Sequence, residues 1–151
     1  MVYSGAYALV LVLHLLTALF VVGPSVVAGL GSARHARSGE AGALRAAMRT
    51  TRLYGVATIV VVVLGTGMVG LGDVGGEWDF SQAWISASYA LWFIAVALTL
   101  VVVVPAQASA LEALDSGEAA AALAARITVG AGLSALAYAA IVALMVLKPG
   151  V

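Results

Sequence analysis

The sequence contains no cysteine, and few of its residues carry a charge. Without cysteine the chain cannot form disulfides, thiolate metal sites or cysteine-ligated iron–sulfur clusters. Charged residues make up 9% of the 151 residues, whereas a soluble domain typically has about 25%. Because 64% of the residues are hydrophobic, the chain has too little polar surface to cover a water-soluble globule. The composition therefore predicts an integral membrane protein.

Four long hydrophobic runs organise the chain. A helix needs about 20 apolar residues to cross the hydrocarbon, so we expect spanning helices near residues 6–30, 53–71, 84–104 and 127–147. Pro24 is expected to kink the first helix, and Leu111 and Leu114 indicate that the third helix continues past Pro105. The predicted fold is all-α, an up-down four-helix membrane bundle, with residues 1–151 forming a single membrane domain. A cleaved signal peptide is not expected, because the first four residues have no lysine or arginine.

Basic residues gather on one side of the predicted bundle. The connections 31–52 and 105–126 hold all six arginines, whereas the opposite side has only Lys148. By the positive-inside rule these connections face the cytoplasm, with both termini outside, in a multi-pass protein of the bacterial inner membrane. Anionic lipid headgroups of the bilayer are the expected partners of the arginines. Nucleic-acid binding is not expected, because the basic stretch is short and lacks the aromatic residues that stack on bases.

One ionisable side chain, His14, lies within a predicted span. Such a group is costly in lipid and marks a functional hypothesis. Counting about 1.5 Å per residue from the outer helix ends places four other side chains at the same depth. These are Thr66, Tyr89, Trp92 and Tyr138. The count predicts a pocket of five side chains in the outer-leaflet half of the bundle. The loop 73–83, with Trp78 and Phe80, is expected at the membrane surface.

Three functions for His14 remain open from the sequence. A neutral His14 hydrogen-bonded to a tyrosine or threonine would hold helices together in a non-enzymatic accessory or oligomerising subunit, alone or in a larger membrane complex. Alternatively, His14 is the axial ligand of a b-type haem iron in a protein with an electron-transfer or oxidase role. No second membrane histidine exists, so the sixth ligand would be a methionine or tyrosine, the iron would be five-coordinate, or two chains would share the haem. In the third function His14 contacts substrate in an oligomeric small-molecule permease.

Short motifs along the whole chain resemble one family. They are Leu13-His14 early in the first helix, Gly23 before the basic connection, Gly65-Thr66-Gly67, Trp84, and Met145-Val146-Leu147-Lys148-Pro149. On these residues the chain resembles the bacterial integral membrane proteins of the domain of unknown function 2269 family. The resemblance implies a small four-helix membrane protein and carries no activity with it.

A more distant likeness involves two haem-associated membrane families. The Leu13-His14 pair, followed by small residues and a basic connection, is similar to the copper-resistance D type and the membrane protoporphyrinogen oxidase type. Only His14 carries over from this likeness. The oxidase type has a lysine at a later helix start, where this chain reads Trp84-Ile85-Ser86-Ala87-Ser88. The copper type has more histidines and methionines than this chain.

Overall fold

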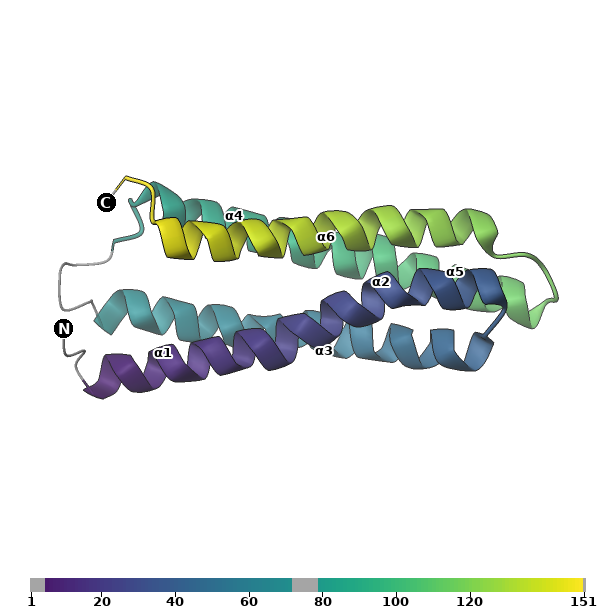
Figure 1. The fold of residues 1–151 in the computed structure, drawn as a ribbon, viewed down its shortest axis with the longest axis horizontal. Coiled ribbons are helices and arrows are strands. Elements are labelled where there is room, and N and C mark those ends of the chain that lie inside the picture. Colours follow the sequence, from purple (N-terminus) through teal and green to yellow (C-terminus); the bar gives the residue numbers. More distant parts are fainter. Residues whose placement is uncertain (1–4, 72–78, 151) are drawn as a thin grey trace.

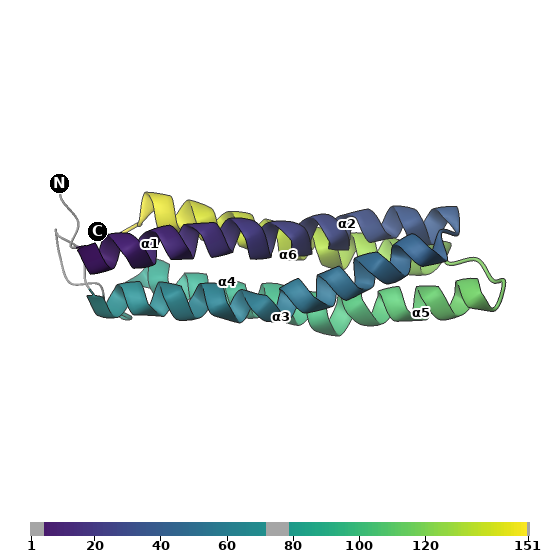
Figure 2. The same cartoon turned by 90° about the horizontal axis from the view of Figure 1, so that it is seen from below.

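Four long helical rods form the molecule in the computed structural model, which describes residues 5–71 and 79–150. Each rod is long and apolar enough to cross a membrane, and no strand occurs among these described residues. The rods lie side by side and alternate in direction (Figure 1, Figure 2). The first rod is α1 (Gly5–Thr17), η1 (Ala18–Val22) and α2 (Gly23–Ser38), and the second is α3 (Ala41–Leu71). The third is α4 (Ala83–Ala97), η2 (Leu98–Val103) and α5 (Val104–Asp115), and the fourth is α6 (Ala121–Leu147). The prediction of an all-α four-helix membrane bundle is confirmed.

The rods are longer than the hydrophobic runs that predicted them. The connection expected at 31–52 is helical except at Gly39 and Glu40, and that expected at 105–126 is helical except at residues 116–120. Gly39 ends α2 with a left-handed φ of 74°, and the N–H of Glu40 donates to the carbonyl of His35. The continuation past Pro105 occurs as predicted. Hydropathy marks the part of a helix that lies in lipid, whereas the helix itself continues as far as its backbone hydrogen bonds do.

A π-helical turn precedes the proline in each of the two interrupted rods. Pro24 follows η1, and Pro105 follows η2. Proline has no N–H and its ring crowds the carbonyl four residues earlier, so a wider turn before it relieves the clash. The expected disturbance at Pro24 is thus a π turn, and Pro105 has the same arrangement although only its continuation was predicted.

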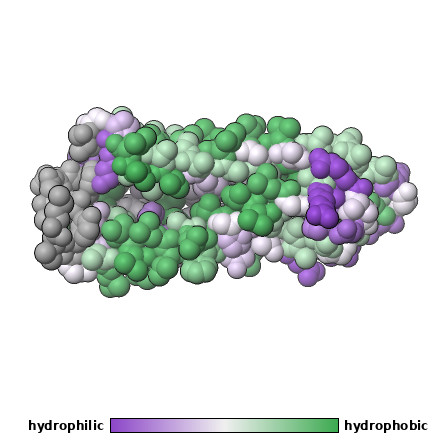
Figure 3. All heavy atoms as spheres, viewed as in Figure 1, coloured by the Kyte–Doolittle hydropathy of each residue, from purple (hydrophilic) through white to green (hydrophobic). Residues whose placement is uncertain are grey.

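The bundle has two halves, which differ in packing. The basic half contains α2, α5 and the adjoining ends of α3 and α6, and ends in hydrophilic residues (right side of Figure 3). Its core is closely packed around Leu44 and Ile127, neither of which has any exposed surface. Small residues let the helices approach one another there: Ala33, Ala36, Ala106, Ala110, Ala120, Ala124 and Ala131. The open half contains α1, α4 and the other ends of α3 and α6.

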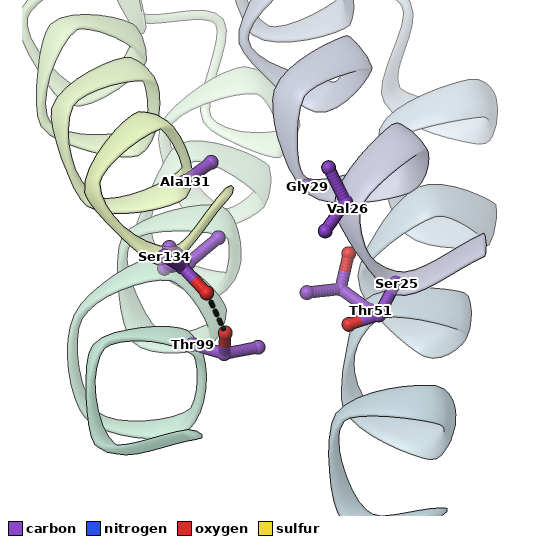
Figure 4. Close-up of a pocket in the computed structure, with 8 residues that line it drawn as sticks. Ser25, Val26, Gly29, Thr51, Thr99, Ala131 and Ser134 are labelled. Carbon is purple, nitrogen blue, oxygen red and sulfur yellow. Dashed lines mark hydrogen bonds between the residues drawn. The ribbon is translucent and has the colours of Figure 1, made fainter. Parts of the chain in front are cut away.

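A polar layer separates the halves. The hydroxyls of Thr99 and Ser134 hydrogen-bond at 2.9 Å, and Ser25 and Thr51 lie on the opposite side of a small space (Figure 4). This space has a volume of about 10 Å³, enough for one water molecule among these hydroxyls. About two turns further into the basic half, the Gln107 amide donates to Thr51 at 3.3 Å and to Ser32 at 2.8 Å. All four rods are joined by these hydrogen bonds, so the layer fixes where the open half begins.

Candidate ligand-binding cleft

The open half contains a cleft between two helix pairs. α1 packs on α3 and α4 packs on α6, while α1 and α6 are not packed against each other. The space between the pairs has a volume of about 570 Å³, within the range of about 300–1,000 Å³ typical of ligand pockets. It is visible as a hollow between the two apolar ridges on the left of Figure 3. Most of its lining is aliphatic or aromatic, so the cleft suits an apolar ligand.

His14 lies on the α1 wall of the cleft and is 6% exposed. Its Nδ1 is 2.9 Å from the backbone carbonyl of Val61 on α3. A carbonyl only accepts, so Nδ1 carries the hydrogen and Nε2 of the neutral ring has the lone pair. Among the described residues Nε2 has no hydrogen-bond partner. A histidine fixed through Nδ1 in this way is the usual arrangement for metal ligation through Nε2.

Gly65 gives the imidazole its place against α3. A Cβ at Gly65 would lie 3.1 Å from Cε1 of His14 and 3.5 Å from its Nδ1. The contact with Cε1 is closer than ordinary van der Waals distance, so any larger residue at 65 would push the ring away from the helix. The group that approaches Gly65 from the rest of the molecule is the His14 side chain.

Four of the five residues predicted to share a layer line the cleft. These are His14, Tyr89, Trp92 and Tyr138, whereas Thr66 is not among the lining residues. Thr66 instead hydrogen-bonds to the hydroxyl of Tyr89, joining α3 to α4 beside the cleft. The helical rise gives the depth of a residue along its helix, but not the direction of its side chain.

A second pair of residues also joins α3 to α4. The indole Nε1 of Trp92 donates to the Thr58 hydroxyl at 3.1 Å. The Tyr138 hydroxyl is buried near Thr58, but it makes no hydrogen bond of standard geometry with the described residues. Thr58 and Val61 had no part in the sequence prediction. Thr58 is one of several threonines, and Val61 takes part through its backbone carbonyl, so no sequence pattern distinguishes either residue.

Charged side chains lie mainly at the basic end, far from the cleft. Arg45 pairs with Asp115 at 3.3 Å, and Arg37 donates to the hydroxyl of Thr128 at 3.1 Å. His35 is partly exposed, and its Nδ1 lies 3.0 Å from the Glu40 carboxylate. A hydrogen bond from Ser38, and then one from His35, lower the pKa of Glu40 below its ordinary value. The Arg45 and Arg37 contacts thus join rods to each other at the basic end, and the His35 contact joins α2 to the turn that follows it.

The described residues contain no cluster of three or more histidines, cysteines or acidic residues that could hold a metal ion. His14 is therefore the one imidazole available to a metal in the cleft. Such a metal would need most of its ligands from a cofactor, as haem iron has from the porphyrin nitrogens. Met68, Met145, Tyr89 and Tyr138 also line the cleft, and they are the side chains that the sequence offered as a sixth ligand.

Comparison with known proteins identifies the family. A family model described as "Predicted integral membrane protein (DUF2269)" matches residues 8–149, nearly the whole chain. No curated protein and no solved structure matches the chain. The matched range includes His14 and Gly65 and continues to Pro149, as the short motifs predicted. The chain therefore belongs to the DUF2269 family of predicted integral membrane proteins.

Proposed function

We propose that this protein is a small accessory subunit of the membrane that holds an apolar cofactor in its cleft, and that the cofactor is haem b. The observation that supports this most directly is His14, whose Nδ1 is held by Val61 while Nε2 has no partner among the described residues. Imidazole coordinated through Nε2 is a common axial ligand of haem iron. The remaining ligands in the plane would come from the porphyrin.

The cleft fits this group in volume and in chemistry. Its volume of about 570 Å³ and its aliphatic and aromatic walls suit a large, flat, apolar ring. Lys148 is among the lining residues at the mouth, where a cation would lie near the carboxylates of a haem. Trp92 and Tyr138 offer aromatic faces on the wall opposite His14. Haem bound here would supply one-electron chemistry, and the chain's own residues would bind it and keep water away.

The other functions left open by the sequence have less support in this geometry. A permease needs a polar route across the bilayer, whereas beyond the polar layer the basic half has a closely packed core of alanine, leucine and isoleucine. A purely structural His14 would donate its Nδ1 hydrogen to Val61, as it does, but would leave a cleft of this size without a role. Association with itself or with a larger complex is compatible with the proposal.

An absorbance spectrum of detergent-purified protein from haem-replete cells tests the proposal. We expect a Soret band that is lost in His14→Ala, because the ring that ligates the iron is removed. The matched control is His35→Ala, which removes the other histidine of the chain, at the basic end, and should keep the band. A colourless preparation that also fails to take up added haemin would overturn the proposal. In addition, Met145→Leu and Met68→Leu show which methionine, if either, is the sixth ligand.

A further inference from the structure

The two sides of the cleft differ, and one of them is closed. On that side α3 meets α4, and two hydrogen bonds cross between these helices. Thr66 bonds to the hydroxyl of Tyr89, and the indole of Trp92 donates to Thr58. Bonds of this kind are stable in a bilayer, where no water competes for the donors and acceptors. Nothing of the size of a lipid chain or a porphyrin passes there without breaking them.

The other side, between α1 and α6, is open. α1 and α6 do not pack on each other, and the hollow in Figure 3 lies between the ridges that these two helices form in the same view of Figure 1. Leu15 on α1 lines the cleft and is 58% exposed, and Val142 on α6 lines it and is 62% exposed. A side chain that both lines the cleft and is mostly exposed stands at its edge. Leu19 and Val146 have the same two properties.

The edge of this opening is entirely aliphatic and faces the hydrocarbon. By a rise of about 1.5 Å per residue, Leu15 lies about 15 Å from the start of α1 at Gly5. The opening therefore extends from near the membrane surface into the depth of one leaflet. Water does not enter an aliphatic opening at this depth, but acyl chains do, since they replace apolar contacts with apolar contacts.

Building on the ligand-binding cleft proposed above, we infer that the α1/α6 opening is a lateral portal. Acyl chains of the adjoining leaflet enter it when the cleft holds no ligand. The ligand reaches His14 through this portal after dissolving in the bilayer, and not directly from water. The class of ligand is then limited to molecules that partition into lipid, and their polar end stays near the surface, where Lys148 lines the mouth.

Trp92 reports on the portal without any ligand, because its ring lines the cleft. The chain has three tryptophans, so Trp78→Phe with Trp84→Phe leaves Trp92 as the single fluorophore. In vesicles of phosphatidylcholine brominated along its acyl chains, we expect a loss of about half the Trp92 emission, since the ring lines the cleft that the acyl chains would enter. The matched control adds Trp92→Phe and Phe93→Trp, which places the fluorophore one residue away. Phe93 is 70% exposed, so this variant measures direct quenching by surrounding lipid.

Closing the portal separates access through α1/α6 from any other route. The natural chain has no cysteine, so Leu11→Cys and Val142→Cys introduce the only two thiols. These positions lie about 9 and 7.5 Å from the ends of their helices, at nearly the same depth. Joining them with a bifunctional maleimide should remove most of the Trp92 quenching and leave that of the Phe93→Trp control unchanged. It should also slow haemin uptake relative to the same variant before joining.

Two results would overturn the portal. One is Trp92 emission that brominated lipid does not quench, and the other is quenching and haemin uptake that are unchanged after joining. If the single-tryptophan protein is not recovered, a spin label at Ile141→Cys gives the same answer. It should be relaxed more by lipid-dissolved oxygen than by a water-soluble nickel chelate. Lipid quenching without a Soret band would overturn haem binding alone, and a Soret band without lipid access would overturn the portal alone.

Discussion

The same four rods are closely packed at one end and spread apart at the other. In the basic half, alanines at the contacts bring α2, α3, α5 and α6 together around Leu44 and Ile127. In the open half, the facing positions hold large side chains such as His14, Trp92 and Tyr138, and a space of about 570 Å³ remains between the helix pairs. The size of the facing side chains thus decides whether four apolar helices form a core or a cleft.

The change from one packing to the other occurs at the level of the two prolines. Pro24 and Pro105 follow π turns in the first and third rods, and the polar layer of Ser25, Thr51 and Thr99 lies beside them. A π turn shifts the faces that a helix presents before and after it. A rod can therefore pack tightly on one side of the turn and form a cleft wall on the other. The closely packed basic half is therefore expected to stabilise the fold, and the open half to hold the proposed ligand.

The largest effect is expected from truncating the basic core. Ile127 and Ile141 lie on the same helix, α6, but Ile127 is fully buried in the basic half and Ile141 lines the cleft. Ile127→Ala should cost about 2–5 kcal/mol of unfolding free energy, because it leaves a new cavity among helices that cannot close over it. Ile141→Ala only enlarges an existing space, and should cost less than about half as much.

Unfolding of both variants in mixed micelles, followed by circular dichroism, measures this difference. The two substitutions remove the same atoms from the same helix, so each is the control for the other. Equal losses would mean that the open half is as closely packed in the membrane as the basic half. The assignment of stability to one half would then be wrong.

A smaller effect is expected where the cleft wall meets His14. Gly65→Ala places a methyl group 3.1 Å from Cε1 of the imidazole, so the ring must shift by a few tenths of an ångström. A displaced metal ligand typically loses affinity, and we expect about tenfold weaker haem binding in a haemin titration. The matched control is Gly67→Ala, whose methyl group would lie 3.9 Å from Val10, an ordinary contact. Equal affinities in the two variants would show that the ring position at Gly65 does not matter for binding.

Much of the fold follows from the sequence because hydropathy alone reports the spans. Four apolar runs predicted four rods, and each run lies within a rod of the structure. Leu111 and Leu114 predicted that the third rod continues past Pro105, but hydropathy did not mark the helical segment 31–38, which is polar yet contains helix-forming alanine and arginine. The first rod ends at Gly39, which has the left-handed conformation. The sequence has seventeen glycines, and nothing in it shows which of them ends a helix.

The candidate site was only partly predictable, for a different reason. Depth along a helix can be counted, and the four residues His14, Tyr89, Trp92 and Tyr138 that were predicted at one depth all line the cleft. The width of the space between these side chains could not be predicted from residue spacing, since it depends on how the four helices pack. The hydrogen bond from His14 to the Val61 carbonyl could not be predicted either, because every residue has a backbone carbonyl and the sequence does not show which one accepts.

The smallest effect is expected at the turn that closes the basic half. Hydrogen bonds from Ser38 and His35 lower the pKa of Glu40, so its carboxylate stabilises the folded state at pH values above the ordinary pKa of 4.5. This contribution is lost as the pH falls below 4.5 through the lowered pKa of the folded protein, because the protonated carboxyl no longer accepts both bonds. Glu40 is fully exposed and solvent screens it, so we expect a shift of only a degree or so in Tm, measured from about pH 5 to about pH 3.

Glu40→Gln should remove that part of the pH dependence and leave haem binding in the distant cleft unchanged. If instead Glu40→Gln weakened haem binding, the two halves would be coupled. The hypothesis that one half stabilises the fold and the other binds the ligand independently would then be wrong.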